Sequence, residues 1–341
     1  MRLDDFDYRL PDERIAQHPL EPRDSARLLV DQGSSAPLHR HVRDLTEFLR
    51  EGDLLVVNDT KVIPARLRLQ RATGGAAEAL LLDPLDADRR TWEAMVRPAK
   101  KLHPGEELFS NGTPLVRVLR RSEAGDTMLV ELLGEGDPLV LLQQHGEMPL
   151  PPYITVSHGV GRSAGDDRYQ TVYANEPASS AAPTAGLHFT PDLLTRIEAM
   201  GIPTRRVELV VGLDTFKPVS AADPRDHVIH SERYRVDPSV LEECAAARRV
   251  VAAGTTSVRA LESAATFGTG SGRTRLFIHR PYEWKVVDVL MTNFHLPRTT
   301  LLMMIDAFVG PRWRTLYAEA LRERYRFLSF GDAMLLDRSL S

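Results

Sequence analysis

The sequence predicts an α/β main domain, a mixed sheet or barrel with helices, into which a small antiparallel β-barrel domain is inserted. In the first and last parts of the chain, segments with helical periodicity alternate with short apolar segments typical of buried strands. Between about residues 65 and 150 the pattern changes to short alternating segments separated by turns such as Gly74-Gly75 and Asn111-Gly112, which is typical of a small barrel. The length of 341 residues favours about two domains. We therefore expect a discontinuous α/β domain, residues 1–64 and 151–341, and an inserted β-barrel domain, residues 65–150.

The composition is that of an ordinary soluble protein, with 43% hydrophobic and 26% charged residues. The single cysteine, Cys244, excludes an internal disulfide and a cysteine-cluster metal site, which fits a reducing compartment. The N-terminus has no apolar signal-peptide segment, and no stretch approaches the ~20 apolar residues that cross a bilayer. We therefore expect a cytoplasmic protein without a membrane partner. The net charge of -4 gives no overall attraction to nucleic acid, so an RNA partner would be held by local basic patches.

The segment before the insertion predicts two helices and two strands. In order these are a helix opened by Pro11, Asp12 and Glu13, a strand at Arg27–Val30, a helix at Asp44–Leu49 and a buried strand at Leu54–Val57. Arg23 lies in a polar connector, where its guanidinium can bind an anion through two N–H groups; a solvated loop tied by its own ion pairs is the alternative. Asn58, Asp59 and Lys61 directly follow the second strand, where α/β proteins often place ligand-binding residues.

The insertion is predicted to contain several short strands and a closing helix. The strands are Arg66–Gln70, Ala77–Leu82, Trp92–Val96, Val116–Leu119 and Thr127–Leu132, and the helix is Pro138–Gln144. Arg97, Lys100 and Lys101 make this part locally basic, and Trp92 lies near them in the sequence. These cations either form the solvated face of the strands or contact RNA phosphates, and both interpretations stay open.

A loop of small residues, Pro177–Thr190, is the segment around which a site is expected to form. Gly186 can adopt a positive φ, which a larger residue resists, and small residues allow a ligand to approach the backbone. Thr190 is a suitable N-cap for a helix that begins at Pro191, so Thr184 and His188 are placed beside a helix N-terminus that favours anions. A proline-rich connector whose hydroxyls only cap the helix is the alternative.

The second half of the chain continues the α/β pattern. The predicted elements are a strand at Thr204–Val211, a helix from Ser239, a strand at Arg249–Ala253, a helix through Arg259 and Glu262, strands at Arg275–Ile278 and Val286–Val289, and a helix at Thr299–Val309. The turn Gly254-Thr255-Thr256-Ser257 joins a strand to a helix N-terminus and favours an anion. It lacks the lysine of a phosphate-binding P-loop, and G-x-G-x-x-G is also missing, so neither an ATPase nor a dinucleotide enzyme is supported.

His230 and Glu232 lie two residues apart, which places them on one face of an extended chain. With His227 they suggest a metal site at first sight. Their spacing matches no metalloprotease helix motif, however, so we do not expect a bound metal.

Ordered segments over nearly the whole chain resemble one known family, the S-adenosylmethionine:tRNA ribosyltransferase-isomerases of queuosine biosynthesis. The matching segments are 10–19 with 23–28, 58–66, 146–154, 168–174, 181–190, 254–259 and 292–297, the last reading Thr-Asn-Phe-His-Leu-Pro. Two positions depart from the family pattern: Val210 stands where a histidine is expected, and Asp214 where a glycine is expected. Arg280-Pro281-Tyr282 also replaces an expected Pro-Gly-Tyr. We therefore assign no catalytic group to the strand that contains Val210.

The resemblance implies an enzyme that transfers and isomerises the ribosyl group of S-adenosylmethionine onto 7-aminomethyl-7-deazaguanine in tRNA, giving epoxyqueuosine, adenine and methionine. S-adenosylmethionine and tRNA are then substrates, and neither a cofactor nor a metal is required. We also expect a monomer. A tRNA-binding homologue with impaired catalysis and a methyltransferase are alternatives; the missing glycine-rich first loop counts against the methyltransferase.

The reaction needs general acid-base groups, for which histidine is the usual side chain. The catalytic candidates are His188, His230 and His295, with Glu232 or Asp59 as orienting carboxylates; a purely structural, hydrogen-bonded role stays open for each histidine. Candidates for substrate binding are Arg23, Asn58, Lys61, Thr184, Gly186, Thr255, Thr256, Ser257, Arg259 and Asn293, and candidates for tRNA binding are Arg97, Lys100 and Lys101.

Overall fold

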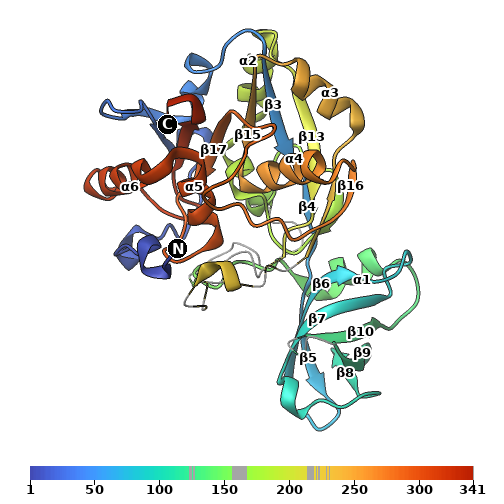
Figure 1. Ribbon diagram of the computed structural model, residues 1–341. Helices are drawn as coiled ribbons and strands as arrows, with labels where there is room; N and C mark the ends of the chain where they lie inside the picture. Colours follow the sequence, from blue (N-terminus) through green and yellow to red (C-terminus); the bar gives the residue numbers. More distant parts are fainter. Residues whose placement is uncertain are drawn as a thin grey trace.

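The main domain of the computed structural model is a mixed β-sheet covered by helices, and a separate β-barrel lies at one end of it (Figure 1). The structure describes residues 1–122, 125, 127–155, 167–212, 219, 221, 223–227, 229 and 231–340. The helices are α1 (Pro138–His145), α2 (Pro191–Ala199), α3 (Pro238–Ala246), α4 (Thr255–Phe267), α5 (Thr300–Val309) and α6 (Trp313–Arg322). The strands of the main domain are β1 (Arg27–Val30), β2 (Leu38–His41), β3 (Asp53–Asn58), β4 (Thr60–Val62), β12 (Glu176–Ser179), β13 (Thr204–Leu209), β14 (Glu232–Arg235), β15 (Arg249–Ala253), β16 (Ser271–Thr274), β17 (Val289–Asn293) and β18 (Ala333–Asp337).

The centre of the main sheet is parallel. Among the described residues its order is β16-β14-β13-β3-β15-β17-β18-β1-β2. Strands β13, β3, β15 and β17 run in the same direction, and Ala253 pairs with both Val57 and Met291. The carboxyl ends of these strands therefore lie at one edge of the sheet, which is where open α/β sheets bind ligands.

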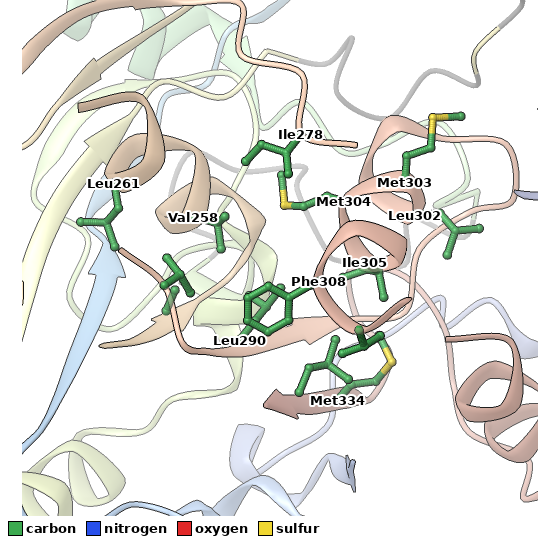
Figure 2. Close-up of a cluster of buried hydrophobic side chains, with 14 of the residues drawn as sticks. Val258, Leu261, Ile278, Leu290, Leu302, Met303, Met304, Ile305, Phe308 and Met334 are labelled. Atoms are coloured by element: carbon green, nitrogen blue, oxygen red, sulfur yellow. The ribbon is translucent and has the colours of Figure 1, made fainter. Parts of the chain in front are cut away.

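Both faces of this sheet are buried, as parallel strands require. Leu54 and Val56 of β3 belong to the core on one side, whereas Leu55 and Val57 belong to the core on the other side. In Figure 2, α5 lies against β17 and β18, and its Ile305 and Phe308 belong to the same core cluster as Leu290 and Met334. Each fully buried aliphatic or aromatic side chain contributes roughly 1.5–3 kcal/mol, so this core holds α4 and α5 firmly in place.

The inserted part is an antiparallel barrel, as the sequence predicts. The order β5-β6-β7-β10-β9-β8 is closed by pairing of β8 with β5, and the short β11 adds to β5. Leu67, Leu81, Trp92, Val118 and Val130 are buried in its interior. The strands are β5 (Arg66–Arg71), β6 (Ala76–Pro84), β7 (Thr91–Arg97), β8 (Glu107–Ser110), β9 (Thr113–Arg121), β10 (Met128–Leu132) and β11 (Gly146–Glu147). The fold class is thus confirmed, while the domain boundaries after residues 64 and 150 stay a prediction.

Two predicted helices are only short 3₁₀ helices. The segment opened by Pro11 forms one turn, Asp12–Arg14, because Ile15 leaves it to form a β-bridge with Phe327. The segment expected at Asp44–Leu49 is a 3₁₀ helix at Val42–Glu47. Local periodicity could not reveal these tertiary constraints.

Two predicted strands near residue 280 are also corrected. No strand forms at Arg275–Ile278 among the described residues, since β14 pairs instead with β16 just before it. The strand expected at Val286–Val289 begins later, at Val289, because the backbone N–H groups of Val286 and Val287 donate to Oε1 of Glu262 and not to a neighbouring strand. The shift places Asn293 at the end of β17 and not in a loop.

Candidate active site

A cavity lined by both polar and apolar side chains lies at the carboxyl edge of the parallel strands. Its volume is about 580 Å³, including space open to solvent. It combines three segments that are far apart in the sequence: the loop before α2, the turn between β15 and α4, and the end of β17. The lining residues are Tyr153, Ala182, Thr184, Ala185, Val211, Gly254, Thr255, Thr256, Thr292, Asn293, Phe294, His295, Leu296, Thr299, Leu301, Leu328 and Ser329. We call it the strand-end cavity.

The turn after β15 presents two threonines to this cavity. Gly254 has φ of 92°, a left-handed conformation that glycine adopts without strain, and α4 starts at the next residue. Thr255 and Thr256 line the cavity, and the buried Oγ1 of Thr256 has no hydrogen-bond partner within the described part of the chain. Ser257 points elsewhere, since its hydroxyl donates to the carbonyl of Ala253 at 2.8 Å. Thr256 is therefore a candidate ligand contact, whereas Ser257 has a structural role.

Asn293 connects the loop before α2 to the end of β17. Its side chain is buried, and Oδ1 accepts a hydrogen bond from Thr184 at 3.0 Å. Nδ2 lies 3.1 Å from Nε2 of His188 and 3.2 Å from the carbonyl of Leu328. Two predicted site residues, Thr184 and His188, thus meet on one amide.

His188 lies one hydrogen bond behind the strand-end cavity. It lines a smaller neighbouring cavity of about 280 Å³ together with Arg23 and Arg326. Its ring also hydrogen-bonds to the backbone of Arg23. Burial, assisted by the positive charge of Arg326, lowers the pKa of His188 to about 4. The ring is therefore unprotonated at neutral pH, and Nε2 can accept from Asn293.

His295 lines the strand-end cavity directly. Its Nε2 lies 3.1 Å from the hydroxyl of Thr292, and its backbone N–H donates to the hydroxyl of Tyr317 at 3.0 Å. Burial lowers the pKa of His295 to about 3. Of the predicted histidines within the described residues, this is the one that touches the cavity; His230 lies outside the described residues.

Gly186 is needed for a reason other than the predicted positive φ. Its φ is ordinary, because it is not among the glycines with positive values. A Cβ at this position would lie 2.2 Å from the hydroxyl of Tyr173 and 2.8 Å from the methyl group of Thr171. The predicted N-cap that follows is confirmed: the Thr190 hydroxyl accepts from the backbone N–H of Leu193 at 3.1 Å.

A second and larger cavity, of about 1850 Å³ including open solvent, lies where the barrel approaches the main domain. Glu232 and Arg259 line it and form a buried ion pair. Asp83 of the barrel and Arg273 of the main domain also line it and form an ion pair. We call it the interdomain cavity. Leu301 lines both cavities, so the two are adjacent.

Three candidates that follow β3 lie outside both cavities. The Asn58 side chain is fully buried and bonds to the backbone of Leu209 through Nδ2 at 3.0 Å and Oδ1 at 3.2 Å, so it ties β3 to β13. Asp59 is buried near Tyr173, and burial raises the pKa of its carboxyl. Lys61 is exposed in β4. Sequence proximity to a strand end identified these residues, but the chain turns away from the cavity after Asn58.

The predicted tRNA-binding residues Arg97, Lys100 and Lys101 are exposed at the end of β7 and in the following 3₁₀ turn, Ala99–Lys101. Their exposure allows contact with a nucleic acid and equally a purely solvated role.

Sequence reasoning missed several lining residues. The Tyr153 hydroxyl lies 2.7 Å from Oγ of Ser329, and both residues line the strand-end cavity with Thr292 and Thr299. Tyr153 and Thr292 fall in segments that match the family pattern, which is a usable signal. Ser329 lies in an irregular segment with no motif, so only the fold brings it to the cavity.

No helix in the described part of the chain is long and apolar enough to cross a membrane. No group of three or more histidine, cysteine, aspartate or glutamate side chains in that part of the chain is arranged to hold a metal ion.

The chain is similar to proteins of one family over almost its whole length. The sequence profile of the family described as "Queuosine biosynthesis protein" matches residues 3–336. A protein of Symbiobacterium thermophilum named S-adenosylmethionine:tRNA ribosyltransferase-isomerase is 50% identical over 348 residues, which cover 98% of this chain and 100% of that protein. A protein of the same name from Thermus thermophilus is 49% identical over 351 residues, covering 98% and 99% of the two chains. Among solved structures, an S-adenosylmethionine tRNA ribosyltransferase of Thermotoga maritima shares 36% identity over 97% of this chain and 99% of that chain, with a TM-score of 0.54.

Proposed function

The chain belongs to the queuosine biosynthesis protein family, and from this premise we propose that it transfers and isomerises the ribosyl group of S-adenosylmethionine onto the 7-aminomethyl-7-deazaguanine wobble base of tRNA. The products are epoxyqueuosine-tRNA, adenine and methionine. The protein is accordingly a transferase, a ribosyltransferase-isomerase like its relatives. It acts as a monomer in the cytoplasm, and S-adenosylmethionine is consumed as a substrate, with no cofactor or metal needed.

The observation that carries this proposal is the convergence of three separate family segments on one cavity. Thr184, Thr255 with Thr256, and Asn293 with His295 all lie in its wall. Hydroxyl, amide and imidazole groups can bind the hydroxyls and ring nitrogens of a nucleoside. The adenosyl part of S-adenosylmethionine occupies this cavity.

The chemistry requires removal of a proton from the ribose methylene that the sulfonium acidifies, followed by departure of adenine, attack by the tRNA amine and loss of methionine as the epoxide closes. His295 and His188 are both unprotonated at neutral pH, because burial lowers their pKa values to about 3 and about 4. Each ring therefore presents an unprotonated nitrogen, and such a low pKa makes it a weak base at neutral pH. His295 is in position to act on the substrate, while His188 holds Asn293 in place through the hydrogen bond to its amide.

The tRNA binds on the side of the interdomain cavity, which is large enough for a nucleobase that leaves its stack. Arg97, Lys100 and Lys101 of the barrel contact its phosphates. Val210, which replaces the histidine of the family pattern, lies in the wall of this cavity and is buried, so this position offers no proton carrier. Asp214 lies outside the described residues.

The test is release of adenine. The protein is incubated with S-adenosylmethionine and tRNA that carries 7-aminomethyl-7-deazaguanine, and adenine is measured by chromatography. We expect adenine only when both substrates are present, and none when the tRNA carries guanine at that position. Tight binding of the modified tRNA without adenine release would instead identify a catalytically impaired tRNA-binding homologue, and methylated RNA would identify a methyltransferase.

A further inference from the structure

Arg259 is a buried arginine, and only one side of its guanidinium has a hydrogen-bond partner among the described residues. Its relative exposure is 8%, and Nη1 donates to Oε2 of Glu232, which is 6% exposed. The buried Nε and Nη2 atoms of Arg259 have no hydrogen-bond partner among the residues that the structure describes. A buried polar group without a partner costs about 1–3 kcal/mol, and more when it is charged, so this edge is expected to meet a ligand.

The unused edge is the one that binds carboxylates elsewhere in this chain. Arg71 uses Nε and Nη2 to hold the two oxygens of Glu106, at 2.6 and 3.2 Å. Arg249 uses the same two atoms for Asp53, at 2.9 and 2.6 Å. Nε and Nη2 carry parallel N–H groups that match the spacing of carboxylate oxygens. In Arg259 the contact with Glu232 leaves this edge open.

Arg259 lies on the same helix, α4, as two residues that line the other cavity. It lines the interdomain cavity, whereas Thr255 and Thr256, one turn earlier in α4, line the strand-end cavity. Four residues of an α-helix span about 6 Å, so one small molecule can contact both positions. Leu301 of α5 lines both cavities and lies between them.

We propose that the Nε and Nη2 edge of Arg259 binds the carboxylate of the methionyl end of S-adenosylmethionine. The inference rests on the proposed function, since it presupposes that the adenosyl end occupies the neighbouring cavity. The sulfonium and the ribose then lie at the junction of the two cavities, where the tRNA base can approach from the interdomain side. Glu232 acts as a positioning residue that fixes the guanidinium through Nη1.

A tRNA phosphate is the less suitable partner for this edge. Phosphates lie on the outside of a folded RNA and are met by exposed cations, whereas the unpaired nitrogens of Arg259 are buried. Arg273 in the same wall is exposed, with half of its side-chain surface accessible, and is the kind of residue that a phosphate would reach. The carboxylate of a small ligand bound in the adjoining cavity can reach the buried nitrogens of Arg259.

The test compares two unreactive ligands that differ only in the carboxylate. These are S-adenosylhomocysteine and its decarboxylated form, 5′-deoxy-5′-(3-aminopropylthio)adenosine, and their Kd values are measured by equilibrium dialysis with and without the tRNA substrate. The variant R259K keeps a positive charge beside Glu232 but loses the two-pronged edge. The matched control is R50Q, an exposed arginine just before β3. Thermal unfolding of each variant checks that the protein remains folded.

We expect R259K to raise the Kd of S-adenosylhomocysteine about 10- to 100-fold, because charge-assisted hydrogen bonds contribute about 1.5–3 kcal/mol. The Kd of the decarboxylated ligand should stay within about 2-fold of the wild-type value. R50Q should change neither Kd. If R259K weakens the binding of both ligands equally, weakens the binding of neither, or weakens only the binding of tRNA, the inference is overturned while the proposed function stays intact. Failure of the wild-type protein to bind either nucleoside would overturn the proposed function itself, and the inference with it.

Discussion

At the scale of single residues, Asn293 explains how distant motifs form one site. Its amide accepts from Thr184 on one side and contacts His188 on the other. An amide offers both an acceptor and two donors, so one buried asparagine can hold two side chains and the Leu328 carbonyl together. The geometry of the cavity therefore depends on a few side-chain hydrogen bonds in addition to the backbone.

His188→Ala should lower turnover far more than it lowers S-adenosylmethionine binding. Loss of an acid-base group typically costs ~100-fold to 10,000-fold in rate, and loss of the contact with Asn293 also loosens the cavity wall. Adenine release in a single turnover is measured together with thermal unfolding of the variant, and the exposed His41→Ala serves as control. Near-normal release, or a loss that only follows the fraction of unfolded protein, would leave His188 with a structural role alone.

Acidification should destabilise the protein partly through these buried histidines. The pKa of His188 falls from 6.5 in the unfolded chain to about 4 in the folded protein, so the unfolded state binds more protons between these values. The stabilisation is complete above pH 6.5 and is lost as the pH falls toward 4. From the two pKa values, His188 should contribute about 2 kcal/mol to the loss of unfolding free energy between pH 7 and pH 5.

This pH dependence is measured by urea unfolding at both pH values. His188→Gln keeps a hydrogen-bonding side chain but removes the titration, so its stability should fall less steeply with acidification than that of the wild type. An identical fall in both proteins would show that His188 does not take part.

At the scale of elements, the 3₁₀ helix Thr184–His188 owes its position to close packing. Gly186 allows Tyr173 to lie directly against the backbone, and the Tyr173 hydroxyl there has no hydrogen-bond partner within the described residues. A side chain at position 186 would push this helix away from Asn293. The small residue is thus a packing requirement that sets the distance between the loop and β17.

Gly186→Ala should destabilise the protein by about 1–3 kcal/mol, the usual cost of forcing an extra methyl group into a packed interior. The added Cβ meets the hydroxyl of Tyr173, so Tyr173→Phe in the same chain should restore part of the stability. Urea unfolding of the two single variants and the double variant gives the coupling energy. Additive effects of the two changes would show that the clash with the hydroxyl is not the cause.

At the scale of the whole molecule, the barrel and the main domain meet around the interdomain cavity. Asp83 of β6 and Arg273 of β16 pair across the gap, and both flank the space next to Arg259. Figure 1 shows the barrel as a distinct body joined to the main domain by neighbouring chain segments. In the function proposed above, the barrel gives tRNA a second surface, and the reacting base enters between the barrel and the main domain.

Replacing Arg97, Lys100 and Lys101 with alanine should weaken tRNA binding and reduce its salt dependence. Each lost phosphate contact removes about 0.7–0.9 from the slope of log K against log salt, so three contacts remove about 2 to 3. Binding is measured by filter retention over a salt series, and a control replaces three exposed arginines of the main domain, Arg9, Arg43 and Arg50. An unchanged slope would show that the barrel cations are merely solvated.

Much of the architecture was predictable because it rests on local patterns. The buried strands Arg27–Val30 and Arg249–Ala253, the cap at Thr190, and the change to barrel strands after residue 65 all follow from periodicity, capping chemistry and turn residues. The strand at Val286–Val289 was misplaced because a distant carboxylate, Glu262, takes the backbone donors of that segment.

The sequence by itself determined the fold class, the family and several members of the site, because these depend on motifs that are continuous along the chain. Only the tertiary structure decided which candidates meet. It placed Thr256, Asn293 and His295 in the wall of one cavity and His188 one hydrogen bond behind it. It also placed Asn58 where its side chain joins β3 to β13 by hydrogen bonds. Within the described residues it also left one edge of the Arg259 guanidinium without a hydrogen-bond partner. The physical reason is that burial and hydrogen-bond partners are set by residues far away in the chain, so a side chain's chemical role is a property of its packed surroundings and not of its local sequence.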